Sequence, residues 1–276
     1  DKVQFVLLGW GHKLCEIADI IIDSGLKKPI ILTHPKKYHK RDNQMYENTV
    51  LSKDIFTYAK KNNLKIIETD NPNDSNTIKK ILKLNCNVAF SLGCRSIIKK
   101  NFLDSFNQLV FNIHPSYLPE EQGSANFSWR ILNQQKFVAG TIHQMDEGID
   151  TGSIIIQEKS KNNIIKLDYP IDYDIHTMKL YNKIFKQFIN KIILKEDIIL
   201  IKQNLKNSSY FSRLYAKVNG AIDFNWTAEE IERFVRAFSY PYEGAFTYIK
   251  NQKVHIQECV IEKTNLDNHP FTCGKI

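Results

Sequence analysis

The sequence lacks long apolar runs and paired cysteines. No stretch approaches the roughly 18 uncharged apolar residues of a membrane-spanning helix. The chain passes from Asp1 into an apolar stretch without a signal-peptide pattern, so we expect no membrane association and a cytoplasmic location. The five cysteines are scattered, with no Cys-x-x-Cys pair and no histidine at zinc-ligand spacing. Neither a structural metal nor a disulfide framework is therefore expected.

A dinucleotide fingerprint is also lacking. Gly9-Trp10-Gly11 follows the first apolar stretch but is not completed by a third glycine, and no acidic residue stands clearly at the end of the second expected strand. Both features are needed to bind a nicotinamide dinucleotide. We therefore expect no nicotinamide cofactor.

What the sequence does have is the composition of a folded protein with a basic surface. Its 276 residues, of which 42% are hydrophobic, can form one large domain and a smaller one. The net charge of +8 would suit an anionic partner such as a nucleotide or tRNA. Lysine is nevertheless frequent along the whole chain, even in residues 36–41, which we interpret as a loop. A solvated basic surface is therefore the favoured explanation of the charge.

The first 115 residues alternate short β-branched runs with stretches of helical period. This alternation is typical of βαβ units and predicts an α/β fold with a Rossmann-like, mostly parallel sheet. The expected strands are 3–8, 29–33, 64–68, 87–92 and 109–113, and the expected helices are 12–24, 52–61, 76–84 and 96–102.

The pattern changes in the second half of the chain. We predict a large N-terminal domain over residues 1–200 that includes its closing helix, a polar linker over 201–209, and a small, mainly β domain over 210–276. The expected helices here are 125–133, 174–194 and 228–237, and the expected strands are 137–145, 154–158, 246–249 and 254–261.

Asn112 and His114 stand at the end of the fifth expected strand. A strand alternates sides, so both side chains point to one face, at the carboxyl end where open parallel sheets bind ligands. Pro115 then forces the chain out of the strand. The alternative for a single histidine is a buried ring bonded to a backbone carbonyl.

The loop of residues 146–152 holds three acidic residues and two glycines between two apolar strands. By itself it is more typical of an acidic hairpin turn. Taken together with Asn112 and His114, its Asp150 completes a set of three groups: an amide that donates a hydrogen bond, an imidazole that accepts a proton, and a carboxylate that orients the imidazole. These are the groups needed for attack on a carbonyl carbon.

Asn112-Ile113-His114-Pro115-Ser116-Tyr117-Leu118-Pro119, followed by Gly123 and by residues 140–152, resembles the catalytic core of the folate-dependent formyltransferases. The resemblance implies a Rossmann-like domain and 10-formyltetrahydrofolate as co-substrate, with no metal. It implies that Asn112 donates to the formyl oxygen, that His114 takes the proton of the attacking amine, and that Asp150 holds the imidazole.

The resemblance also implies where the two substrates bind. The pterin would lie against the backbone of one strand end and of the acidic loop, although the first of these can equally be a strand ending in a turn. The acceptor side carries an acidic stretch where the family commonly has a basic residue, and exposed surface charge is the alternative there. The cofactor residues are Phe90, Ser91, Leu92, Gly93, Met145, Asp146, Glu147 and Gly148, and the acceptor residues are Tyr117, Glu120, Glu121, Gln122, Gly123 and Ser124.

The C-terminal part resembles the start of the second module of tRNA and sugar formyltransferases, in residues 222–226, 235–238 and 241–246. The last pattern is similar in bifunctional lipid A-modifying enzymes and in nucleotide-sugar formyltransferases. Enzymes acting on methionyl-tRNA carry a longer barrel here, so a nucleotide-linked amino sugar is the expected acceptor, and a nucleic acid is not. Expected apolar strands on the small domain favour a homodimer.

Four alternatives remain open. Methionyl-tRNA formylation is supported by the net charge. Glycinamide ribonucleotide formyltransferases share the Asn-x-His-Pro-Ser motif but normally end earlier. Formyltetrahydrofolate hydrolases use the same three residues but usually carry a regulatory domain in front. A catalytically silent nucleotide-sugar-binding module would not need to retain all three residues.

Overall fold

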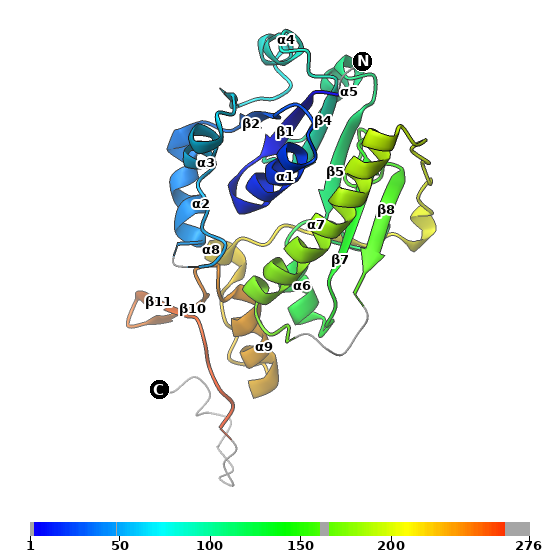
Figure 1. The fold of residues 1–276 in the computed structure, drawn as a ribbon. Coiled ribbons are helices and arrows are strands. Elements are labelled where there is room, and N and C mark those ends of the chain that lie inside the picture. Colours follow the sequence, from blue (N-terminus) through cyan, green and yellow to red (C-terminus); the bar gives the residue numbers. More distant parts are fainter. Residues whose placement is uncertain (1–2, 48, 161–165, 263–276) are drawn as a thin grey trace. The chain divides into compact units, whose positions relative to one another are not determined.

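The computed structural model describes residues 3–47, 49–160 and 166–262, and the chain divides into two compact units (Figure 1). Unit 1 comprises Asp1–Gly123, Val138–Ser160 and Ile175–Tyr210, and unit 2 comprises Ser124–Phe137, Lys161–Asp174 and Phe211–Ile276. Because segments of unit 2 interrupt unit 1, the units are not consecutive in sequence. The domain limits expected above stay a prediction.

Unit 1 is built around a seven-stranded sheet in the order β3-β2-β1-β4-β5-β7-β8. The five strands from β3 to β5 are parallel, and β7 and β8 continue the sheet antiparallel. The expected Rossmann-like, mostly parallel sheet is confirmed. The strands are β1 (Phe5–Gly9), β2 (Ile30–Thr33), β3 (Ile66–Glu68), β4 (Val88–Leu92), β5 (Val110–His114), β7 (Ala139–Gln144) and β8 (Ile154–Lys159).

Apolar residues on both faces of this sheet are covered by helices. On one face, α1 (Gly11–Asp23) lies beside α7 (Pro170–Leu194), where Asn182 donates to Glu16 at 2.7 Å (Figure 1). Phe188 of α7 packs on Phe90 and on Phe111, with ring centroids 5.7 and 5.2 Å apart. On the other face, α4 (Ser75–Leu82) and α5 (Lys100–Ser105) share one buried cluster with β1, β4 and β5. Burying each large apolar side chain contributes about 1.5–3 kcal/mol, which keeps the sheet rigid beneath its carboxyl edge.

The remaining elements of unit 1 are short. The pair β6 (Gln122–Gly123) and β9 (Tyr210–Phe211) forms a separate two-stranded sheet. Connecting helices are η1 (Lys36–Tyr38), α2 (His39–Met45), α3 (Ile55–Asn62) and η2 (Leu205–Asn207).

Unit 2 packs α6 (Asn126–Leu132) against α9 (Ala228–Phe238) and carries the hairpin of β10 (Ala245–Ile249) and β11 (Gln252–Ile256) together with α8 (Ala216–Asn219). Ser128 of α6 donates to the carbonyl of Ala237 at 2.7 Å. Thr227 and Glu230 form a capping box that begins α9. The expected small antiparallel strand region is therefore present, next to helices.

Two expected helices have different limits. The helix expected over 96–102 begins at Lys100, because Asn73 accepts from the Lys99 N–H at 2.7 Å and donates to the Ile97 carbonyl at 2.9 Å, which holds these residues outside the helix. The helix expected from 174 begins at Pro170, a residue suited to the first helical turn.

Two further predictions are wrong. Residues 36–41, interpreted as a loop, belong to η1 and α2, because this lysine-rich stretch has helix-forming residues that the charge pattern concealed. The strand expected over 254–261 is β11, Gln252–Ile256, because Lys250 and Asn251 both take positive φ and form a tight hairpin turn.

Candidate functional site

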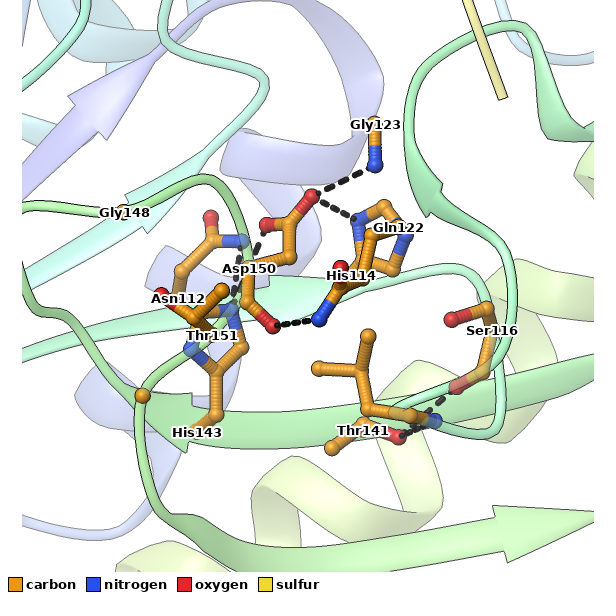
Figure 2. A network of polar contacts seen from close by, with 12 residues as sticks. Asn112, His114, Ser116, Gln122, Gly123, Thr141, His143, Gly148, Asp150 and Thr151 are labelled. Carbon is orange, nitrogen blue, oxygen red and sulfur yellow. Dashed lines mark hydrogen bonds and ion pairs between the residues drawn. The ribbon is translucent and has the colours of Figure 1, made fainter. Parts of the chain in front are cut away.

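Asn112 and His114 point from β5 into one polar network at the carboxyl edge of the sheet (Figure 2). The antiparallel pairing of β5 with β7 places Asn112 opposite His143 and His114 opposite Thr141. Directly opposed side chains of antiparallel strands lie close together. The amide nitrogen Nδ2 of Asn112 accordingly lies 3.2 Å from Nε2 of His143.

Asp150 reaches the same network from the loop between β7 and β8, with its backbone in the left-handed region at φ +56°. Its carboxylate oxygen Oδ2 lies 3.4 Å from Nδ1 of His114 and accepts a hydrogen bond from the Gly123 N–H at 2.9 Å. The other oxygen, Oδ1, lies 3.5 Å from Nε2 of His143. The amide, the imidazole and the carboxylate singled out in the sequence therefore converge, although 36 residues separate Asp150 from His114.

The surroundings keep Asp150 ionised. Burial by itself raises the pKa of this carboxyl group, but the charge of a protonated His114, the hydrogen bond and charge of a protonated His143, and the Gly123 N–H together outweigh it. The resulting pKa is about 2, against an ordinary value of 3.8. A negative charge therefore stands beside the imidazole at neutral pH.

Both nitrogens of His114 face acceptors. Nε2 lies 2.9 Å from the backbone carbonyl of Glu121, and a carbonyl only accepts, so Nε2 carries a hydrogen. In the neutral ring the other nitrogen, Nδ1, is then the basic atom. Once Nδ1 gains a proton, the carboxylate of Asp150 stabilises the charged ring. The carbonyl contact foreseen as the alternative for a single histidine is thus present together with the carboxylate.

His143 belongs to the network and was not assigned a role from the sequence. Its Nδ1 lies 3.0 Å from the Gln144 carbonyl, so in the neutral ring Nε2 accepts from Nδ2 of Asn112. The ring is buried, with 2% of its area exposed. A signal was present in the sequence, because an antiparallel strand following β5 would align His143 with Asn112.

The expected acceptor residues separate into two groups. Tyr117 and Glu120 are exposed. Glu121 and Gln122 are buried, and Nε2 of Gln122 lies 3.3 Å from the Asp150 carbonyl. Gly123 contacts the Asp150 carboxylate as described. Ser124 belongs to unit 2 and donates through its N–H to the Phe211 carbonyl at 2.9 Å.

A second glutamine, Gln203, also contacts the Asp150 carbonyl, at 2.8 Å. It lies in the polar stretch interpreted as a linker. The composition of that stretch carried no sign of a buried contact, and the sequence offered no signal for it.

The expected cofactor residues lie on β4 and on the acidic loop. Phe90 directs its ring into the core against Phe185 and Phe188, which leaves its backbone for the predicted ligand contact. Ser91 and Leu92 are buried at the strand end, Gly93 follows at φ +70°, and Met145 donates through its N–H to the Val110 carbonyl.

The other three expected cofactor residues, Asp146, Glu147 and Gly148, line a cavity of about 350 Å³ together with Lys100, Leu103 and Gln108. The carboxylate of Asp146 accepts from the Gly148 N–H and from the Thr151 hydroxyl. These two bonds shape the acidic loop along one wall of the cavity.

Within residues 3–47, 49–160 and 166–262, no group of three or more His, Cys, Asp or Glu side chains is placed to hold a metal ion. The cysteines in these ranges, Cys15, Cys86, Cys94 and Cys259, are free thiols. No helix in the described part of the chain is long and apolar enough to cross a membrane.

Comparison with known families gives two matches. The formyl transferase profile matches residues 1–181, and the profile of the formyl transferase C-terminal domain matches residues 216–276. Together these ranges contain every residue of the network except Gln203.

The similar proteins differ in what their names state. The bifunctional polymyxin resistance protein of Wigglesworthia glossinidia brevipalpis is 31% identical over 86% of the chain, but the chain spans only 34% of that relative's length. A methionyl-tRNA formyltransferase of Coxiella burnetii is 30% identical over 90% of the chain and 76% of its own. The structure of an N-formyltransferase from Helicobacter canadensis, in complex with folinic acid and dTDP-3-aminofucose, is 26% identical, with a TM-score of 0.65 over 86% of this chain and 81% of its own.

Proposed function

Since the chain belongs to the formyl transferase family, we propose that it moves a formyl group from 10-formyltetrahydrofolate to the primary amine of a nucleotide-linked amino sugar. One observation carries the proposal. Asn112, His114 and Asp150 meet in one network at the carboxyl edge of the sheet, with the Asp150 carboxylate 3.4 Å from the His114 ring. This set of groups suits attack on a carbonyl carbon.

In the first step the acceptor amine attacks the formyl carbon, and a C–N bond forms while the carbonyl oxygen becomes an oxyanion. Nδ2 of Asn112 donates one hydrogen to His143, which orients the amide and leaves the second hydrogen for the oxyanion. A donor positioned in this way stabilises the transition state by about 3 kcal/mol.

In the second step the proton of the attacking amine passes to the His114 ring, directly or through water. Asp150 stabilises the resulting imidazolium. The ring then returns the proton to the folate nitrogen as its bond to the formyl carbon breaks. The products are a formamide and tetrahydrofolate.

The folate would lie along the acidic loop. The cavity of about 350 Å³ beside Asp146, Glu147 and Gly148 falls within the size range of small-molecule sites. Lys100 on its wall is a cation that could face a carboxylate of the folate tail. The Helicobacter canadensis relative binds folinic acid, a formylated folate.

A sugar acceptor is supported by the loop next to Asp150. Residues 116–124 contain two glutamates and no lysine or arginine. Hydroxyl groups can donate to carboxylate and carbonyl oxygens, whereas a tRNA acceptor stem requires cations against its phosphates. The same relative binds dTDP-3-aminofucose.

Methionyl-tRNA is the second candidate acceptor. The Coxiella burnetii relative and the net charge of +8 favour it. The acidic loop argues against it.

The test is a panel of dTDP- and UDP-linked amino sugars and methionyl-tRNA, each incubated with 10-formyltetrahydrofolate and scored by mass spectrometry for the addition of one CO. Formylation of an amino sugar with methionyl-tRNA unchanged is the expected result. Formylation of methionyl-tRNA alone would replace the sugar proposal by the second candidate. Absence of formylation on every acceptor would overturn formyl transfer to an amine.

A further inference from the structure

We propose that Gln203 is a positioning residue, which places Asp150 for catalysis by holding the backbone of the loop that carries it. This inference rests on the proposed function, because it assigns Gln203 a part in the same reaction. The residue lies outside the two profile matches and touches no reacting atom.

The side-chain amide of Gln203 bonds to the loop backbone on both sides of residue 151. Its Nε2 donates to the Asp150 carbonyl at 2.8 Å and to the Gly152 carbonyl at 2.7 Å. An amide nitrogen carries two hydrogens, so both are used on this loop. The side chain is buried, with 6% of the residue exposed, and leaving its buried partners without a hydrogen bond is costly.

The position of Gln203 follows from strand register. Ile201 and Ile154 exchange both backbone hydrogen bonds at 2.8 Å as an isolated antiparallel bridge on β8. Gln203 follows Ile201 by two residues, and Gly152 precedes Ile154 by two residues. The same antiparallel register therefore places Gln203 opposite Gly152. The segment after α7 therefore carries Gln203 to the loop. There its side chain supplies the hydrogen bonds.

A second glutamine fixes which way the amide faces. Nε2 of Gln122 lies 3.4 Å from Oε1 of Gln203 and 3.3 Å from the Asp150 carbonyl. With Oε1 of Gln203 accepting, its Nε2 must face the two carbonyls. Gln122 is itself held on β6, where its N–H donates to the Ser209 carbonyl at 2.8 Å.

The two hydrogen bonds from Gln203 are needed because the loop conformation is not intrinsically favoured. Asp150 has φ +56°, and a left-handed residue other than glycine costs about 1–2 kcal/mol. Gly152 is packed so closely that a Cβ there would lie 1.8 Å from the Gln144 carbonyl oxygen. Without Gln203, the Gly152 carbonyl loses this donor and the Asp150 carbonyl keeps only the longer bond from Gln122, so Asp150 can relax away from His114. The bond from the Gly123 N–H reaches the Asp150 carboxylate and does not hold the backbone.

The experiment compares Gln203→Leu and Gln203→Glu with Gln4→Leu. Glutamate keeps the shape of glutamine but is ionised at neutral pH, so it cannot donate to the carbonyls. Gln4 is the matched control, because it is also a buried glutamine whose Nε2 donates to a backbone carbonyl, that of Lys28 at 2.8 Å. It lies beside the amino end of β1, outside the network.

Two readouts separate positioning from general stability. Steady-state kinetics with the acceptor found in the panel gives kcat and both KM values. Histidine NMR gives the pH midpoint at which the His114 ring titrates, and it requires no turnover. The titratable groups facing Asp150 are His114 on β5 and His143 on β7, and both are followed in the same spectra.

We expect both Gln203 variants to lose about 10- to 100-fold in kcat, the cost of a misplaced group, while both KM values stay within about threefold. In Gln203→Leu we also expect the His114 midpoint to fall relative to wild type, because the carboxylate that favours the charged ring has moved. Gln4→Leu should lower Tm without either change.

Normal kcat and an unchanged His114 midpoint in Gln203→Leu would overturn the inference. So would a loss of kcat in Gln4→Leu as large as that in Gln203→Leu. If Gln203→Leu does not fold, Gln203→Glu decides the question by kcat and the two KM values. If wild type formylates no acceptor, the proposed function fails, while the NMR comparison still tests whether Gln203 places Asp150.

Discussion

The end of β5 and the loop after β7 contribute to one network but are held in place in different ways. Asn112 and His114 stand in a strand bonded on both sides, to β4 and to β7. Asp150 stands in a loop with left-handed backbone, held by Gly123, Gln122 and Gln203 from two other segments. The strand positions depend on many backbone bonds, and the loop position depends on a few side-chain and backbone bonds.

Because the β5 residues and Asp150 are held differently, the site should respond differently to substitutions in the two places. A substitution on β5 removes one chemical group and leaves the geometry of the ladder. A substitution around the loop can displace Asp150 while every group of the triad is still present. Substitutions on β5 and substitutions around the Asp150 loop should therefore impair catalysis in different ways.

Asp150→Asn should give the largest effect, because it removes the charge and keeps the shape. We expect kcat to fall about 10³- to 10⁴-fold, as when the acidic member of a catalytic triad is neutralised. Folding and folate binding should remain near normal, because Gln203 bonds to the backbone of residue 150 and not to its side chain.

The measurement is single-turnover formyl transfer together with folate titration. Glu158→Gln is the control, since its carboxylate pairs with Lys183 on the surface. Near-normal turnover in Asp150→Asn would remove the residue from the mechanism.

The next prediction concerns His143 on β7, which accepts a hydrogen bond from Asn112. In His143→Leu the Asn112 amide loses its acceptor, and we expect kcat/KM to fall about 10-fold because the oxyanion donor is no longer oriented. His143→Gln retains an acceptor oxygen at this position and should stay within about threefold of wild type. Equal losses in the two variants would show that packing, and not the hydrogen bond, explains the effect.

Acid unfolding tests the loop side through stability and not through turnover. The pKa of Asp150 is lowered from 3.8 to about 2 in the folded chain, so the ionised carboxylate stabilises the fold above about pH 4. This contribution, roughly 2 kcal/mol, is lost as the pH falls through 2.

Urea unfolding of wild type and Asp150→Asn between about pH 5 and pH 2.5 measures this contribution. The difference in the free energy of unfolding between wild type and Asp150→Asn should become smaller as the pH falls. A gap of constant size would contradict the lowered pKa.

Much of the fold and part of the site could be predicted from the sequence. Alternating apolar runs predict the parallel sheet, and the order Asn112, His114, Pro115 predicts two side chains on one face at a strand end. The helix limits near 96–102 could not be predicted, because the hydrogen bonds of Asn73 that set them join distant parts of the chain. At 36–41 the charge pattern concealed helix-forming residues. His143 was missed for lack of a register, and Gln203 for lack of any local signal.

By itself, the sequence determined the α/β class and the residue types of the triad, because strand alternation and motif spacing are local properties. Only the tertiary structure decided where the Asp150 carboxylate lies. Its backbone is held by a glutamine 53 residues further along the chain, and its charge by rings on two neighbouring strands. A hydrogen bond between segments so far apart depends on folded distances, which no local pattern records.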